Sequence, residues 1–255
     1  MPAFASYPSL KDRVVFVSGG GSGIGASIVE HFAQQGAKVA FVDVDETASK
    51  ALVRKLAAAG HPEPQFSKCD VRDFAAYQRT ITELAGRLGP VTVLVNNAAR
   101  DDRHAMEEVT SDFWDERMAV NVRHQFFAIQ SVVPGMKKAG GGSIVNFSSV
   151  SYHAMTPNLS VYQGAKAAVV GMTRGLARDL GPDKIRLNIV TPGWIMTQRQ
   201  IDLWLTPEAE ADLMKAQCLK EKVYPPDIAR MVLWLASDDS RLVTAQNFVV
   251  DGGRM

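Results

Sequence analysis

The chain has 255 residues, with 28 basic and 27 acidic side chains and a formal net charge of +1. That balance gives no reason to expect nucleic acid or an anionic membrane as a partner. Its 46% apolar and 22% charged residues are typical of a globular protein with a substantial core.

Two cysteines, Cys69 and Cys218, fit no metal-ligand spacing, so we expect no metal site. So few thiols in a chain of this length indicate a reducing compartment. The first residues show no basic segment followed by an apolar core, and no apolar run approaches membrane-spanning length. We therefore expect a cytoplasmic protein without a signal peptide.

Short apolar runs alternate with helical patterns along the chain. Strands are predicted near 13–18, 38–43, 64–70, 91–96, 142–149, 184–192 and 247–253. Helices are predicted over 23–36, 46–59, 73–87, within 111–138, and over 160–180. This alternation predicts an α/β fold with parallel strands and helices on both faces. We expect residues 1–255 to form one domain, with the irregular stretch 193–225 as a substrate lid.

The first predicted strand runs into a glycine-rich turn, SGGGSGIG, at residues 18–25. Gly19, Gly23 and Gly25 let the backbone turn tightly and approach a pyrophosphate, which the following helix N-terminus also attracts. A tight connection without a ligand is the plainer explanation. The position in a first strand–helix–strand unit favours a dinucleotide.

Asp43 closes the second predicted strand, eighteen positions after Gly25. An acidic residue there accepts hydrogen bonds from the adenosine ribose and repels a 2′-phosphate. Val44 follows, and no Arg or Lys lies in the glycine turn, so NAD is predicted over NADP. Asp70, at the end of the third strand, is a plausible partner for the adenine amino group; both aspartates could also be ordinary surface residues.

Tyr162 and Lys166 lie four positions apart in the helix over 160–180, so they share one face. An ammonium beside a phenol favours the phenolate, which makes a proton acceptor for an alcohol. Such a pair alone is most often coincidental. Two further residues favour a functional pair over coincidence: Ser149 ends the fifth predicted strand, and Asn121 lies within a predicted helix. The Asn121 side chain could interrupt that helix and hold a water against Lys166.

The motifs together resemble the short-chain dehydrogenase/reductase family over essentially the whole chain. They are SGGGSGIG (18–25), Asp43, CDV (69–71), NNAA (96–99), Asn121, Ser149, YQGAK (162–166) and TPGWIMT (191–197). Two departures are conservative, because Ser18 stands where threonine is usual and Ala99 where glycine is usual. The resemblance implies a Rossmann-type sheet of seven parallel strands in the order 3-2-1-4-5-6-7, and a homotetramer.

The same resemblance implies residue roles. Tyr162 is the general base, Lys166 lowers its pKa and binds the nicotinamide ribose, Ser149 binds the substrate oxygen, and Asn121 holds a relay water. The residues implied to bind NAD are Ser18, Gly19, Ser22, Gly23, Ile24, Gly25, Asp43, Asp70, Val71, Asn97, Ala98, Tyr162, Lys166, Pro192, Gly193, Ile195 and Thr197.

The substrate side is predicted from three polar loops beside the nicotinamide. The residues expected there are Asp101, Arg103, His153, Asn158 and Trp194, with Ser149 and Tyr162. Hydrogen-bonding groups beside indoles suit a polyhydroxylated small molecule, although ordinary polar loops explain the pattern equally well.

Strings such as DDRH (101–104) and WDERMAVNVRH (114–124) resemble the bacterial NAD-dependent pentose 1-dehydrogenases. This implies oxidation of an aldose, D-xylose first, at its anomeric carbon to a lactone. The alternatives are another secondary alcohol or carbonyl, such as a 3-oxoacyl thioester, and an NAD-binding regulator without turnover. The complete Ser–Tyr–Lys–Asn set disfavours the regulator.

Overall fold

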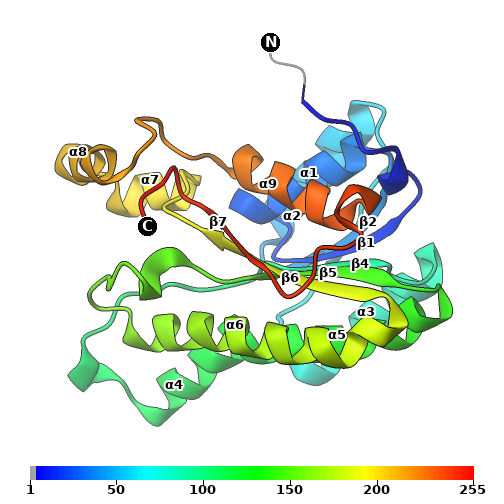
Figure 1. Cartoon of the computed structure of the whole chain (residues 1–255), viewed down its shortest axis with the longest axis horizontal. Helices are drawn as coiled ribbons and strands as arrows, with labels where there is room; N and C mark the ends of the chain where they lie inside the picture. Colours follow the sequence, from blue (N-terminus) through cyan, green and yellow to red (C-terminus); the bar gives the residue numbers. More distant parts are fainter. Residues whose placement is uncertain (1–3) are drawn as a thin grey trace.

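The computed structural model describes residues 4–255, and its centre is a seven-stranded parallel sheet. The strands are β1 (Val14–Ser18), β2 (Lys38–Asp43), β3 (Gln65–Lys68), β4 (Val93–Asn96), β5 (Gly142–Phe147), β6 (Ile185–Pro192) and β7 (Asn247–Val250). Their order is β3-β2-β1-β4-β5-β6-β7, as the family resemblance implied. All neighbouring strands pair in parallel (Figure 1).

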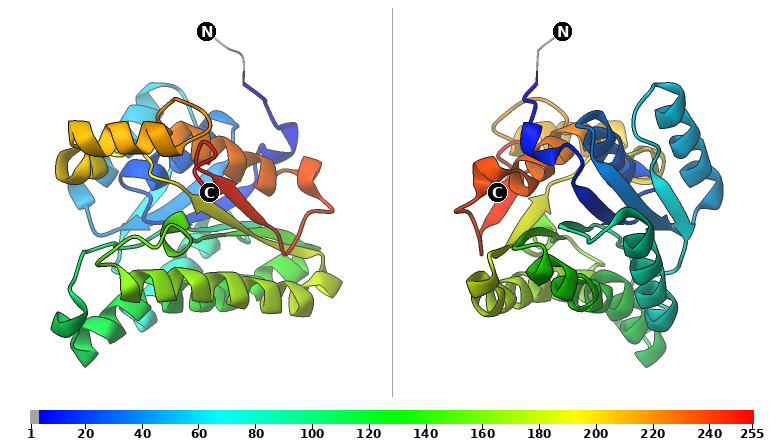
Figure 2. Two further views of the ribbon diagram at one scale, coloured as in Figure 1. Left: turned by 60° about the vertical axis from the view of Figure 1, so that its left-hand side comes forward. Right: turned by 90° about the vertical axis from the view of Figure 1, so that its right-hand side faces the viewer.

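Two layers of helices cover the sheet, as Figures 1 and 2 show. One face packs against α1 (Gly23–Gln34), α2 (Glu46–Ala58) and α9 (Pro225–Ala236), and the other against α3 (Phe74–Leu88), α5 (His124–Lys138) and α6 (Ser160–Leu180). Because successive strand residues point to opposite faces, Val15 and Val17 join the first core and Val14 and Phe16 the second. The doubly wound α/β prediction is confirmed. No helix within residues 4–255 has the length and apolar character needed to cross a membrane.

The chain adds β2 and β3 on one side of β1, and then continues with β4 on the other side of β1. At this point the Ser18 hydroxyl accepts hydrogen bonds from the backbone N–H groups of Asn97 (3.1 Å) and Ala98 (3.2 Å). Open α/β sheets bind ligands beyond the carboxyl ends of their strands at such a crevice. The ends of β1 and β4 are therefore locked together where a ligand is expected.

The long helix predicted within 111–138 is divided. It consists of α4 (Ser111–Met118), a π-helical turn (Ala119–Arg123) and α5. Asn121 is the central residue of that turn and is fully buried. The predicted interruption of the helix at Asn121 is confirmed, and single π-helical turns inside helices occur frequently at functional sites.

The stretch 193–225 contains two short helices that the sequence analysis did not predict. They are α7 (Gln198–Trp204) and α8 (Pro207–Ala216). Thr197 and Thr206 cap them, each accepting a hydrogen bond from a backbone N–H in the first turn. Both helices are too short to show a clear apolar period, which explains the omission. They lie at one end of the molecule (Figure 1).

Candidate active site

A cavity of about 720 Å³ lies along the carboxyl ends of the strands. Its wall combines the glycine turn, the loops after β2, β3, β4 and β5, the start of α6, and α7. Most of the predicted site residues line it: Gly19, Ser22, Gly23, Ile24, Gly25, Asp43, Asp70, Val71, Asn97, Ala98, Asp101, Arg103, Ser149, Tyr162, Lys166, Pro192, Gly193, Trp194, Ile195 and Thr197. The fold thus brings together segments spread over most of the chain.

The glycine turn is shaped to let another chain of atoms approach its backbone. Gly19 has φ +67°, and a Cβ built on it would lie 2.9 Å from the Ala98 Cα. A Cβ on Gly25 would lie only 1.8 Å from the Gly19 carbonyl oxygen. These spacings require glycine and leave the N-terminus of α1 open toward the cavity. The cradle fits the pyrophosphate of a dinucleotide.

Asp43 stands at the end of β2 with its carboxylate held by two backbone N–H groups. Its Oδ2 accepts from Gly21 (2.8 Å) and its Oδ1 from Asp45 (2.9 Å). The carboxylate therefore has a fixed orientation at the edge of the cavity. That position fits the hydroxyls of an adenosine ribose.

Asp70 is already engaged in an ion pair. Arg72 donates to its carboxylate at 2.5–3.0 Å and also pairs with Glu116. The Arg72 guanidinium is the largest cause that holds the pKa of Asp70 below its usual range. Arg72 also lines the cavity, and the sequence analysis missed it. Its only signal was its position two residues after Asp70.

Tyr162 and Lys166 lie on one face of α6, as predicted. The Lys166 Nζ is 5.6 Å from the centre of the Tyr162 ring and donates to the Phe147 carbonyl oxygen at 2.9 Å. Burial lowers the pKa of Lys166 to about 7. Burial also raises the pKa of Tyr162 above its usual range, and the nearby Asp101 charge adds to that rise.

The direction of the Tyr162 shift is opposite to the expectation that Lys166 lowers it. The physical reason is that burial disfavours the phenolate, while the Lys166 ammonium lies against the ring and bonds a carbonyl oxygen. A hydrogen bond with Ser149 and the charge of Arg103 act the other way and lower the pKa of the phenol. Ser149 therefore bears directly on the Tyr162 hydroxyl.

The Asn121 side chain ties the π-helical turn to the loop after β4. Its Nδ2 donates to the carbonyl oxygens of Arg100 and Arg117, both at 3.0 Å, and its Oδ1 accepts from the Arg100 N–H at 3.0 Å. Both amide hydrogens are used, so the side chain anchors the loop after β4. A water held by Asn121 against Lys166 stays a prediction.

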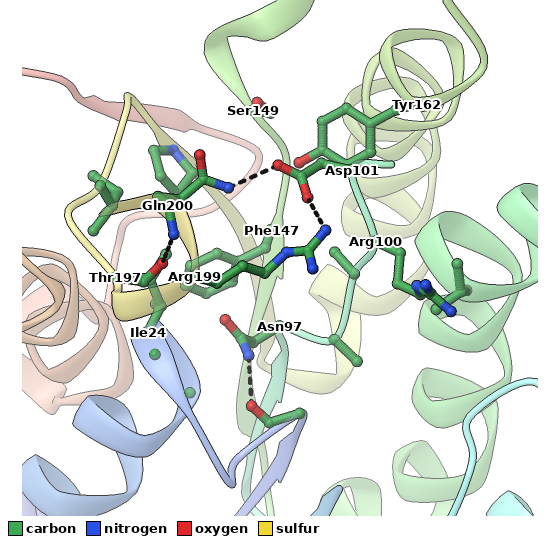
Figure 3. A pocket seen from close by; sticks show the side chains of 18 of the residues that line it. Ile24, Asn97, Arg100, Asp101, Phe147, Ser149, Tyr162, Thr197, Arg199 and Gln200 are labelled. Carbon is green, nitrogen blue, oxygen red and sulfur yellow. Dashed lines mark hydrogen bonds and ion pairs between the residues drawn. The ribbon is translucent and has the colours of Figure 1, made fainter. Parts of the chain in front are cut away.

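The substrate side of the cavity gathers polar groups around Tyr162 (Figure 3). The Asp101 carboxylate accepts from the Gln200 Nε2 at 2.9 Å, and the Gln200 Oε1 accepts from the Trp194 Nε1 at 2.9 Å. Arg103 donates to the Pro157 carbonyl oxygen and lies 5.0 Å from the centre of a Trp204 ring. Three loops and α7 thus meet around the phenol.

Besides Asn121, three predicted site residues do not line the cavity. Ser18 is fully buried and joins β1 to β4, so it supports the cradle from behind. His153 is exposed and stacks on Tyr152, with ring centres 4.0 Å apart. Asn158 is exposed in a left-handed turn with φ +59°. The structure therefore places these three side chains outside the cavity wall: Ser18 lies behind it in β1, and the loop before α6 turns His153 and Asn158 outward.

Gln200 and Arg254 are among the further lining residues that the predicted site did not include. Gln200 lies in the first turn of α7, a helix that was not predicted. Arg254 lies next to the last residue of the chain, far from every motif. Neither carries a local pattern that could have identified it.

Comparison with known proteins identifies the class that this fold and cavity define. The family model described as "Enoyl-(Acyl carrier protein) reductase" matches residues 19–254. The chain belongs to the short-chain dehydrogenase/reductase family and is an oxidoreductase of that family, whose members use nicotinamide cofactors.

Two curated relatives cover nearly the whole chain. A probable galactose dehydrogenase of Rhizobium meliloti is 50% identical over 249 residues, 98% of this chain and 97% of the relative. A D-xylose 1-dehydrogenase of Caulobacter vibrioides is 48% identical over 249 residues, 98% of each chain.

Solved structures share the fold closely. A 7α-hydroxysteroid dehydrogenase complexed with NADH superposes with a TM-score of 0.91 at 29% identity, covering 96% of each chain. A blue fluorescent protein from a metagenomic library, in complex with NADPH, superposes with a TM-score of 0.88 at 38% identity, covering 96% of this chain and 99% of that one.

Proposed function

We propose that this protein oxidises an aldose at its anomeric carbon with NAD, giving the lactone and NADH, and that D-xylose is the first candidate substrate. The observation that carries the proposal is the polar wall around Tyr162, in which Asp101, Gln200 and Trp194 form one hydrogen-bonded chain. A ligand rich in hydroxyl groups suits such a wall. Two relatives with 48–50% identity are named for D-xylose and for galactose, which supports a sugar.

A free donor strengthens the case for a hydroxylated ligand. The Trp204 Nε1 is buried in the cavity wall and has no hydrogen-bond partner within residues 4–255. A buried polar group without a partner is costly, and a ligand oxygen would satisfy it. Indole rings also offer flat apolar surface to the faces of a sugar ring.

Each residue around the phenol has its own role in the proposed oxidation. Ser149 orients the anomeric hydroxyl at Tyr162, and the Tyr162 phenolate takes its proton. Lys166, one turn away, binds the nicotinamide ribose and offers positive charge beside the ring. NAD, when bound along the glycine turn and Asp43, supplies the acceptor for the hydride that leaves C1. The sugar ring oxygen stabilises the carbonyl that develops.

The preference for NAD rests on Asp43. Its fixed carboxylate opposes a 2′-phosphate, and Val44 offers no positive charge. Arg72 is a basic residue that lines the same cavity beside Asp70. Its guanidinium is already shared between the carboxylates of Asp70 and Glu116. It is therefore poorly placed to compensate a phosphate.

The test is a panel of aldoses assayed with NAD and with NADP, in which the absorbance of the reduced cofactor measures turnover. We expect turnover of D-xylose or another aldose, faster with NAD. A 3-oxoacyl thioester with NADH is the opposing arm, because the matching family model is named for an acyl-carrier substrate. Good thioester reduction without aldose turnover would move the assignment to that class, and NADH binding without any turnover would favour a regulator.

A further inference from the structure

Gln200 bridges two side chains of the cavity wall, Trp194 from the loop after β6 and Asp101 from the loop after β4. Its amide oxygen accepts from the Trp194 indole and its amide nitrogen donates to the Asp101 carboxylate, both at 2.9 Å. With one partner that only donates and one that only accepts, the amide has a single satisfactory orientation. Its backbone N–H also donates to the Thr197 hydroxyl, which ties it to the cap of α7.

Asp101 is held from the same helix by a second group. Arg199 reaches its carboxylate at 3.4 Å and that of Asp102 at 3.1 Å. The side chain of Asp101 is 24% exposed, so it is partly withdrawn from solvent. The first turn of α7 thus fixes where this carboxylate stands in the cavity.

The carboxylate stands beside the reacting groups. Figure 3 shows the Asp101 carboxylate next to the Tyr162 hydroxyl. The Asp101 charge adds to the burial that raises the pKa of Tyr162, and it partly offsets the burial that lowers the pKa of Lys166, so it acts on both groups. The oxygen of the substrate that gives its proton to Tyr162 must lie at this hydroxyl. The substituent on the adjoining carbon then falls within reach of Asp101.

We propose that Gln200 is a positioning residue that decides specificity: it holds the Asp101 carboxylate where it accepts a hydrogen bond from a hydroxyl on the carbon next to the one oxidised. The inference rests on the proposed function and deepens it. A carboxylate accepts but does not donate, so it selects a hydroxyl at that carbon and disfavours a bare methylene or a carbonyl oxygen. The selected substrate class is a sugar with a hydroxyl beside its anomeric carbon.

The experiment compares an aldose with its 2-deoxy analogue, using D-galactose and 2-deoxy-D-galactose, or D-xylose and its 2-deoxy analogue. For the wild type we expect kcat/KM to be at least ~10-fold higher for the hydroxylated sugar, the scale of a hydrogen bond to a charged group. Gln200→Leu keeps a side chain of similar size and removes both bonds. It should lower that ratio about 10-fold, mainly by slowing the hydroxylated sugar.

Two further variants separate this role from a general effect on the lid. Asp202→Ala removes an exposed hydrogen bond with Gln198 on the same helix and should keep the wild-type ratio. Asp101→Leu should lower the ratio as Gln200→Leu does, and the double variant should lower it no further, because both act through one contact.

The outcomes distinguish the inference from the function on which it rests. If the wild type oxidises no aldose, the proposed function itself is wrong. A wild type that oxidises both sugars equally well overturns the inference alone. So does a Gln200→Leu variant that slows both sugars by the same factor, since its ratio would then be unchanged.

Discussion

Each residue of the Tyr162 site contributes to the electrostatic balance that sets the proton affinity of the phenol. Burial and the Asp101 charge raise the pKa of Tyr162, and the Ser149 hydrogen bond lowers it. Lys166 is itself so buried that its pKa falls to about 7. The proton affinity of the phenol is therefore set by burial and by several neighbouring side chains.

Tyr162→Phe tests the general base. The change keeps the ring and removes the hydroxyl, so turnover of the true substrate should fall by at least ~10²-fold, the usual scale for a general base. NADH binding, measured by fluorescence, should survive because the ring remains beside Lys166. Wild-type turnover in this variant would show that another group takes the proton.

Asp101→Asn tests the charge beside the base. A negative charge raises the pKa of Tyr162, so its removal lowers that pKa and keeps the phenolate available to lower pH. The acid limb of the profile of kcat against pH should move down by roughly 0.5–1 unit. An acid limb that stays in place, or moves to higher pH, contradicts the prediction. Asp202→Asn, on the outer side of α7, is the matched control.

Asp43 and Val44 should decide between the two nicotinamide cofactors. Wild-type kcat/KM is expected to be higher with NAD, because the Asp43 carboxylate repels a 2′-phosphate. Asp43→Ala combined with Val44→Arg removes that repulsion and adds a positive charge, so the preference should move toward NADP. The measurement is the ratio of kcat/KM for the two cofactors. A wild type that prefers NADP would refute the role of Asp43.

Among the elements, the turn between β1 and α1 has the least room for change. A Cβ on Gly25 would meet the Gly19 carbonyl oxygen at 1.8 Å, and that oxygen also accepts from the Asn97 side chain. Gly86, in α3, is exposed, and a Cβ there would meet no heavy atom of residues 4–255 within 4 Å. Replacing each of these two glycines by alanine therefore compares a crowded position with an open one.

Gly25→Ala should lower the free energy of unfolding by ~1–3 kcal/mol, the usual cost of overpacking, and should weaken NADH binding. Gly86→Ala should raise it by ~0.5–1 kcal/mol, because alanine loses less backbone freedom in a helix. Denaturant unfolding measures both, with NADH fluorescence alongside. A Gly25→Ala variant as stable as the wild type, with normal NADH binding, would mean that the turn relaxes more easily than its spacing indicates.

At the scale of the whole molecule, large apolar side chains remain exposed on separate elements. They include Trp114 on α4 (48% exposed), Phe126 on α5 (37%), Leu242 (83%) and Val249 on β7 (45%). The family resemblance implies a homotetramer, and a tetramer with dihedral symmetry needs more than one association surface, which side chains on separate elements can supply. We expect a homotetramer, with light scattering giving the mass of four 27.7-kDa chains. A mass of one chain across the concentration range would contradict this.

Much of the fold and of the cofactor cradle follows from local patterns. Buried parallel strands are continuously apolar, and the spacing of Gly19, Gly23 and Gly25 reflects a backbone requirement at one turn. Tyr162 and Lys166 share a face because they lie one helical turn apart. Such features depend on neighbours along the chain, so the parallel sheet, the glycine turn and the Tyr–Lys pair could all be predicted before the fold was known.

The residues that surround the phenol are known only from the packed fold. Asp101 and Gln200 meet across 99 positions of sequence, and the helix that carries Gln200 was not predicted. His153 and Asn158 face outward although their sequence neighbours line the cavity, and the pKa of Tyr162 rises where a fall was expected. Burial and distance through space set these properties. Both depend on how remote segments pack, which no local pattern records.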